Sequence, residues 1–89
     1  MKHKTFGEWE VAPDINQEML ENYWDFIFNA KTAARGIAYV HRAIVEAACD
    51  AKILLKTKPD WKKESPALIR WLANEITDVI EKIFDEPKN

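Results

Sequence analysis

The chain has little of the residues that cross-link, turn or anchor a protein. Its 89 residues include one cysteine, Cys49, which excludes an internal disulfide. Only two glycines and four prolines are present, so turn chemistry is scarce and an all-β fold is disfavoured. No apolar run approaches the roughly 18 residues that span a bilayer, and no apolar signal segment follows the first residues. We therefore expect one domain, residues 1–89, that is cytoplasmic and has no membrane role.

Apolar and aromatic residues are plentiful by contrast. Hydrophobic residues make up 47% of the chain, which is too apolar for a disordered protein. The four tryptophans fit two interpretations. They can fill the core of a small domain, where large rings bury much surface, or they can anchor a partner.

Charge is segregated along the chain, although the formal net charge is only −2. Residues 5–30 carry six carboxylates and no base, whereas residues 31–63 carry eight bases against three acids. Residues 64–89 are acidic again, with six acids and three bases. Two interpretations stay open. The blocks neutralise each other within one chain, or the acidic first helix of one copy faces the basic loop of the next, which would build rings or open arrays.

Hydrophobic periodicity predicts three amphipathic helices, at about residues 15–29, 33–55 and 66–84. Asp14 is a candidate cap for the first helix, and Ser65, followed by proline, is a strong start signal for the third. The predicted fold class is all-α, a small three-helix bundle with an extended or single-strand N-terminal arm.

The predicted arm covers residues 1–13. Trp9 and Val11 share one face of an alternating segment that ends before Pro13, which is typical of a half-buried strand. No convincing second strand follows, so the arm either lies along the helices or pairs with another chain. If it serves a partner, deleting residues 1–12 weakens binding or oligomerisation while the helices stay folded.

No constellation of residues carries catalytic or metal chemistry. The soft ligands His3, His41 and Cys49 lack zinc-site spacing, and the thiol has no adjacent base. The only serine is explained as a helix cap. Arg35 and Arg42 could clamp an anion, but no catalytic set accompanies them. We predict a protein that is not an enzyme, with no catalytic residue, cofactor or metal.

Nucleic-acid binding is an alternative that rests on one loop. Lys56, Lys58, Lys62 and Lys63 surround Trp61, and such an arrangement can follow a phosphate backbone and stack a base. The overall pI of about 5.7 argues against it, because binders of this size usually show a stronger basic excess.

The segment Thr5-Phe6-Gly7-Glu8-Trp9-Glu10-Val11-Ala12-Pro13, with the acidic-faced helices and charged tail that follow, resembles small bacteriophage accessory proteins of the tail-assembly-chaperone type. The resemblance includes no diagnostic motif. It implies reversible protein–protein contact, without catalytic residues, in the host cytoplasm.

Our first hypothesis is therefore a non-enzymatic protein-interaction module, acting by self-association or on a protein partner. Its candidate binding residues are Phe6, Trp9, Val11 and Trp61. A phage-type inhibitor of a host protein is built from similar material and stays an alternative.

Overall fold

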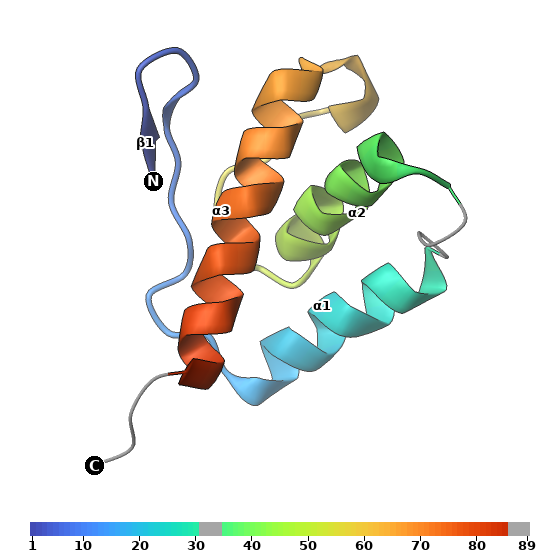
Figure 1. Ribbon diagram of the computed structural model, residues 1–89. Helices are drawn as coiled ribbons and strands as arrows, with labels where there is room; N and C mark the ends of the chain where they lie inside the picture. The colour runs from blue at the N-terminus through green and yellow to red at the C-terminus, as the bar shows by residue number, and fades with distance from the viewer. Residues whose placement is uncertain (31–34, 86–89) are drawn as a thin grey trace.

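The computed structural model describes residues 1–30 and 35–85, and in this part the chain is mostly helical (Figure 1). The elements follow the order β1 (Lys2–His3), β2 (Gly7–Glu8), α1 (Gln17–Asn29), α2 (Ile37–Asp50), the 3-10 helix η2 (Trp61–Lys63) and α3 (Pro66–Asp85). Helix α2 packs against both α1 and α3. The mostly helical class is confirmed, and a short two-stranded antiparallel sheet, which was not predicted, lies at the N-terminus.

The core draws on all three helices, on Trp9 of the arm, on Trp61 of η2 and on the segment that follows α2. Its largest fully buried side chains are Trp9, Val45, Ile53, Leu72 and Ile76. Facing them, α2 presents the buried small residues Ala47 and Ala48, which permit α3 to approach closely. Burying these apolar side chains is the main favourable contribution to folding.

Helix α1 begins two residues later than predicted. Its N-cap is Asn16, whose side-chain oxygen accepts a hydrogen bond from the Met19 amide at 3.0 Å. The prediction that Asp14 caps this helix is therefore wrong. Helix α3 begins as predicted, with the Ser65 hydroxyl accepting from the Ala67 amide at 3.2 Å.

Helix α2 is shorter than the predicted 33–55. At its start, Gly36 is the N-cap with φ of 90°, a backbone conformation that favours glycine, and residues 33–34 lie outside the described part of the chain. At its end, Lys52 adopts φ of 65°. The Ile53 amide donates to the Ala48 carbonyl at 2.8 Å and the Lys52 amide to the Cys49 carbonyl at 3.1 Å, which is a Schellman motif.

This early end frees residues 53–55 to pair with the arm. Val11 and Leu54 form an antiparallel bridge. The Ala12 amide donates to the Ile53 carbonyl at 2.8 Å, and the Leu55 amide to the Glu10 carbonyl at 3.0 Å. The strand partner that the sequence analysis did not find is therefore in the same chain, inside the segment predicted to be helical.

Candidate functional site

A groove lies between the N-terminal halves of α2 and α3, with η2 at one end, and its volume is about 900 Å³. We call it the basic groove. It is lined by Arg35, Ile37, Ala38, Tyr39, His41, Arg42, Trp61, Lys62, Glu64, Pro66, Ile69, Arg70 and Asn74. Four of these residues are arginine or lysine and one is a carboxylate. The groove therefore suits an anionic ligand.

Two guanidinium groups of the groove stack on one aromatic ring. The Cζ atom of Arg35 lies 4.3 Å from the centroid of the Tyr39 ring, and that of Arg42 lies 4.9 Å from it. The planar guanidinium forks keep their N–H groups for hydrogen bonds to a carboxylate or phosphate. The stack therefore holds two cations in place before any ligand arrives, which lowers the entropy cost of binding.

Little negative charge in the structure neutralises these cations. Arg42 approaches Glu46 at 3.9 Å, the outer limit of an ion pair. Among the described residues, Arg35, Lys62 and Arg70 have no carboxylate within that distance. The amino ends of α2 and α3 border the same groove, and their backbone dipoles add partial positive charge.

The groove also has an apolar component. Ile37 lines the groove and is 69% exposed, so it offers apolar surface beside the charged groups. A ligand that offers both a carboxylate and an apolar side chain would match this surface better than a simple anion.

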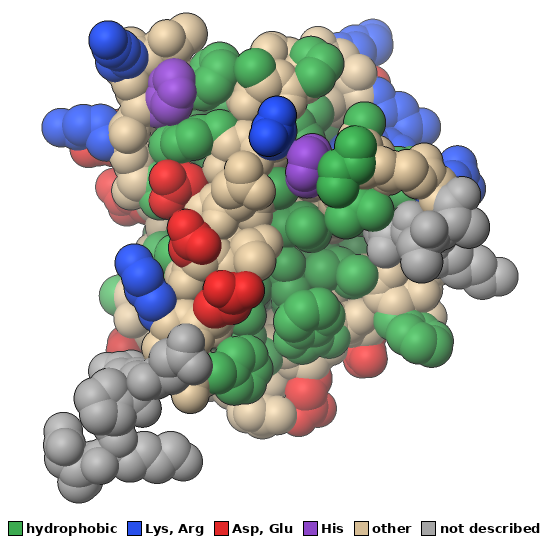
Figure 2. Space-filling view, in the orientation of Figure 1, with side chains coloured by type: hydrophobic (Ala, Val, Ile, Leu, Met, Phe, Trp, Pro, Cys, Tyr) green, Lys and Arg blue, Asp and Glu red, His purple; other side chains and the backbone are tan. Residues whose placement is uncertain are grey.

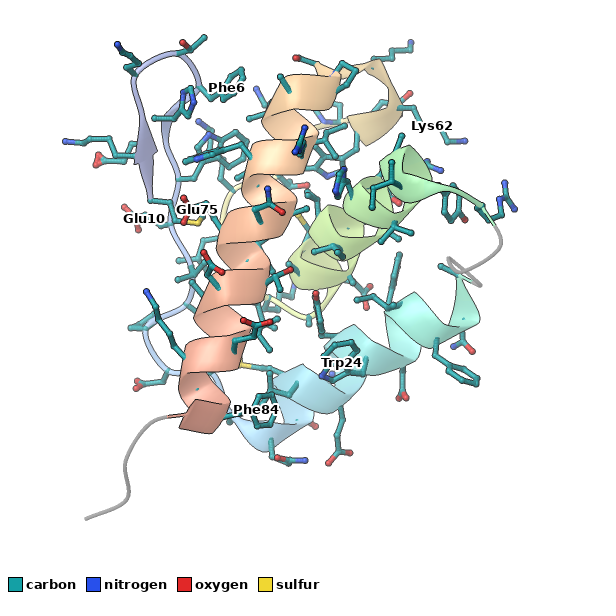
Figure 3. The ribbon with its side chains drawn as sticks, viewed as in Figure 1. Phe6, Glu10, Trp24, Lys62, Glu75 and Phe84 are labelled. Carbon is teal, nitrogen blue, oxygen red and sulfur yellow. The ribbon has the colours of Figure 1, made fainter. Side chains whose placement is uncertain are left out.

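A second surface has the opposite charge. Trp24 is 50% exposed and Phe84 is 64% exposed, and both border a hollow of about 220 Å³ between α1 and the end of α3 (Figure 3). Glu21 and Asp25 line the same hollow, and α1 carries no basic residue. Phe28, on the same helix, is 83% exposed. We call this surface, made by Gln17, Leu20, Glu21, Trp24, Asp25 and Phe84, the acidic aromatic face.

The four predicted protein-binding residues lie mostly inside the molecule. Trp9 is 2% exposed and Trp61 is 5% exposed, and their ring centroids lie 6.0 Å apart. The Trp9 indole N–H donates to the Phe6 carbonyl at 2.9 Å. Phe6 and Val11 are half-buried, and the Phe6 ring packs near Trp71 of α3. In this fold both indoles belong to the core, and Trp61 also lines the basic groove.

The predicted nucleic-acid-binding loop is divided by the fold. The Nζ atoms of Lys56 and Lys58 lie 4.6 and 5.7 Å from the Trp9 ring centroid, and Lys58 also approaches Glu64 at 4.0 Å. Lys62 lines the basic groove, while Lys63 is exposed on η2. Trp61, the predicted stacking residue, is buried. The structure therefore places Lys56 and Lys58 near the buried Trp9 ring and Lys62 in the basic groove, and the four lysines do not form one continuous platform.

The described residues contain no cluster of three or more histidine, cysteine or acidic side chains that could hold a metal ion. Burial raises the pKa of the Cys49 thiol, which disfavours the reactive thiolate, and its Sγ lies 3.9 Å from the Lys56 carbonyl. No helix in residues 1–30 or 35–85 combines the length and apolar character of a membrane span.

Several residues of both surfaces were missed in the sequence. Arg35 and Arg42 were noted as a possible anion clamp, but Arg70 joins them from a helix that begins at Pro66. Trp24 lies on the apolar face of the helix predicted over residues 15–29, but it was not named as a binding residue. The available signal was the width of that face, since one small core does not bury every ring of α1. In comparisons with known proteins, no family model, curated protein or solved structure matches the chain.

Proposed function

We propose that the protein is a non-enzymatic protein-interaction module, a small three-helix bundle that binds its partner in the basic groove. The observation that carries the proposal is the Arg35–Tyr39–Arg42 stack, with Lys62 and Arg70 nearby and Ile37 exposed at the rim. Two held guanidiniums beside an exposed apolar side chain favour a protein segment that carries carboxylates and a large hydrophobic residue.

A setting among bacteriophage accessory proteins fits this mode of action. Proteins of the tail-assembly-chaperone type, which the N-terminal segment resembles, act by reversible contact with other proteins. The basic groove supplies charge-assisted and apolar contacts on one exposed surface, which suits binding and release. That the protein is itself a bacteriophage accessory protein is part of the same proposal.

Binding of a short acidic peptide tests the proposal. The probe is a fluorescent peptide of alternating glutamate and phenylalanine, and the readout is its fluorescence anisotropy at low and high salt. We expect saturable binding that weakens as salt rises, because the contacts combine charge with apolar burial. Arg42→Glu combined with Arg70→Glu should weaken binding roughly 100-fold, since like charges then face the peptide.

The control reverses charge elsewhere. Lys2→Glu combined with Lys4→Glu changes the net charge by the same amount on the exposed N-terminal hairpin, and should bind like the wild type. A single-stranded oligonucleotide of equal charge tests the nucleic-acid alternative. Tighter binding of the oligonucleotide than of the peptide, or equal loss of peptide binding in the control, would overturn the proposal.

A further inference from the structure

The exposed ridge of α3 changes sign along its length. Arg70 lies at one end, the uncharged Asn74 and the half-buried Thr77 lie in the middle, and Asp78 and Glu81 lie toward the other end. Arg70, Asn74, Thr77 and Glu81 follow one another at spacings of four, three and four, and Asp78 lies four residues after Asn74, so these residues lie on one side of the helix. On this side the helix therefore presents a positive end, a neutral centre and a negative end, while the exposed Lys82 lies next to Glu81 in the last turn.

The two surfaces described above continue this polarity. The basic groove takes Arg70 and Asn74 from the first half of α3, and the acidic aromatic face takes Phe84 from its last turn. Between positions 70 and 84 the helix rises about 21 Å, so the two surfaces are separate. Figures 2 and 3 show hydrophobic side chains running down this face of the molecule as far as Trp24 and Phe84, with acidic side chains beside them on the lower half of α3.

We infer that this face binds a second copy of itself, with the two α3 helices antiparallel, so that the basic groove of each copy receives the acidic aromatic face of the other. The inference rests on the proposed function and names the partner of the same groove. A two-fold axis near Asn74 and Thr77 places Arg70 of one copy opposite Glu81 of the other, and repeats that contact on the opposite side.

Charge complementarity is the reason for choosing a second copy as the occupant. The groove is rich in arginine and has an exposed aliphatic rim, while the face is rich in carboxylates and has exposed aromatic rings. Because the basic groove and the acidic aromatic face lie on one side of the molecule, a single two-fold contact pairs each groove with the acidic aromatic face of the other copy. The same arrangement covers Trp24, Phe84 and Ile37, whose exposure in a lone chain is otherwise unfavourable.

The symmetric contact also differs from the head-to-tail array that the charge blocks of the sequence permit. An array needs complementary surfaces on opposite sides of the molecule, so that each added copy leaves a new surface open. Here the two surfaces share one side, and pairing them in a two-fold contact leaves neither open. The expected assembly is therefore a closed dimer.

Sedimentation velocity of the full chain at low salt measures the assembly. We expect a mass of two chains that does not grow further with concentration and falls toward one chain at high salt. Arg70→Glu and Glu81→Arg should each weaken the dimer roughly 100-fold, because each places like charges opposite one another twice. The matched controls Lys4→Glu and Glu8→Arg, both on the N-terminal hairpin, should leave the dimer unchanged.

Rescue separates a specific contact from damage to the fold. Arg70→Glu mixed with Glu81→Arg should form a 1:1 dimer, and the two substitutions on one chain should restore the homodimer, because opposite charges then meet again. A folding defect would not be rescued in this way, and the helical circular dichroism of each variant checks the fold directly.

Three results would overturn the inference. They are a single-chain mass at every concentration, a mass that grows beyond two chains, and the absence of rescue. The acidic peptide distinguishes the two proposals. If the wild type stays a single chain but still binds the peptide in the groove, only the second-copy partner is wrong. If it binds neither, the proposed function fails as well.

Discussion

At the scale of single residues, the structure uses its aromatic side chains in two different ways. Trp9 and Trp61 are packed against each other in the core, whereas Trp24 and Phe84 stand on the surface beside carboxylates. Composition alone could not separate these uses, since burial depends on which helix face meets a neighbour. Two tryptophans thus belong to stability, and Trp24 belongs to the candidate binding surface.

Tyr23 shows how burial couples a single residue to pH. The residue is 2% exposed, and desolvation raises the pKa of its hydroxyl to about 12 from the ordinary value of 10.0. Between these pH values the unfolded chain has lost the phenolic proton while the folded chain retains it. The contribution of this hydroxyl to the free energy of unfolding is therefore fully present below about pH 10 and is lost as the pH rises toward 12.

The substitution Tyr23→Phe tests this coupling. In urea unfolding at pH 8 and pH 11, the wild type should lose more stability between the two pH values than Tyr23→Phe, by about 1.4 kcal/mol, because only the one pH unit above the unfolded pKa of 10.0 contributes. An equal fall in the wild type and Tyr23→Phe would show that burial does not hold the proton on this hydroxyl.

At the scale of elements, α3 was predictable and the end of α2 was not. Hydrophobic periodicity predicted an amphipathic helix over residues 66–84, and its apolar residues Ile69, Leu72 and Ile76 are buried. Ala51 and Leu55 continue the spacing of three and four beyond Ala48, so periodicity extended the predicted helix to residue 55. The Schellman turn that stops it has Lys52 in the left-handed position, where glycine would have signalled the stop.

The sequence-based prediction of the arm and that of the groove were incomplete for the same reason, since a sequence pattern carries no information on tertiary contacts. The alternation around Trp9 and Val11 predicted extended chain, and the structure shows extended chain there. Its partner, Leu54, was hidden in a predicted helix. In the groove, Arg35 and Arg42 were visible on one helix, but no local pattern links them to Arg70. Contacts between distant segments depend on how helices pack, which no local spacing encodes.

Deletion of residues 1–12 tests the arm as an element. The deletion removes the fully buried Trp9 and both hydrogen bonds to residues 53–55. Loss of the indole alone costs about 3–5 kcal/mol, a large part of the stability of a small domain. We therefore expect the truncated chain to lose cooperative urea unfolding and most of its helical circular dichroism. This outcome is the reverse of the one expected if the arm served only a partner.

A full-length variant separates the core contribution from the hairpin surface. Lys2→Ala combined with Glu8→Ala alters exposed side chains of β1 and β2 and should unfold within about 0.5 kcal/mol of the wild type. If the truncated chain unfolds at the same urea concentration as this control, the arm adds nothing to the fold and its role is in binding.

At the scale of the whole molecule, a near-zero net charge coexists with surfaces of opposite sign, which the fold places at two ends of one face. Because only folded chains present these surfaces, dimerisation stabilises the folded state by mass action. The urea midpoint of the wild type should therefore rise with protein concentration. Above the dissociation constant, each tenfold increase adds about 1.4 kcal/mol per mole of dimer.

The Arg70→Glu variant is the control for the concentration dependence of the urea midpoint. The variant changes an exposed residue, so its fold and its midpoint at low concentration should match those of the wild type. Without the dimer, its midpoint should stay constant over the concentration range in which the wild-type midpoint rises. High salt should abolish the wild-type rise by screening the charges between copies. A wild-type midpoint that is independent of concentration would mean that the opposite charges act within one chain, and that they neutralise each other there.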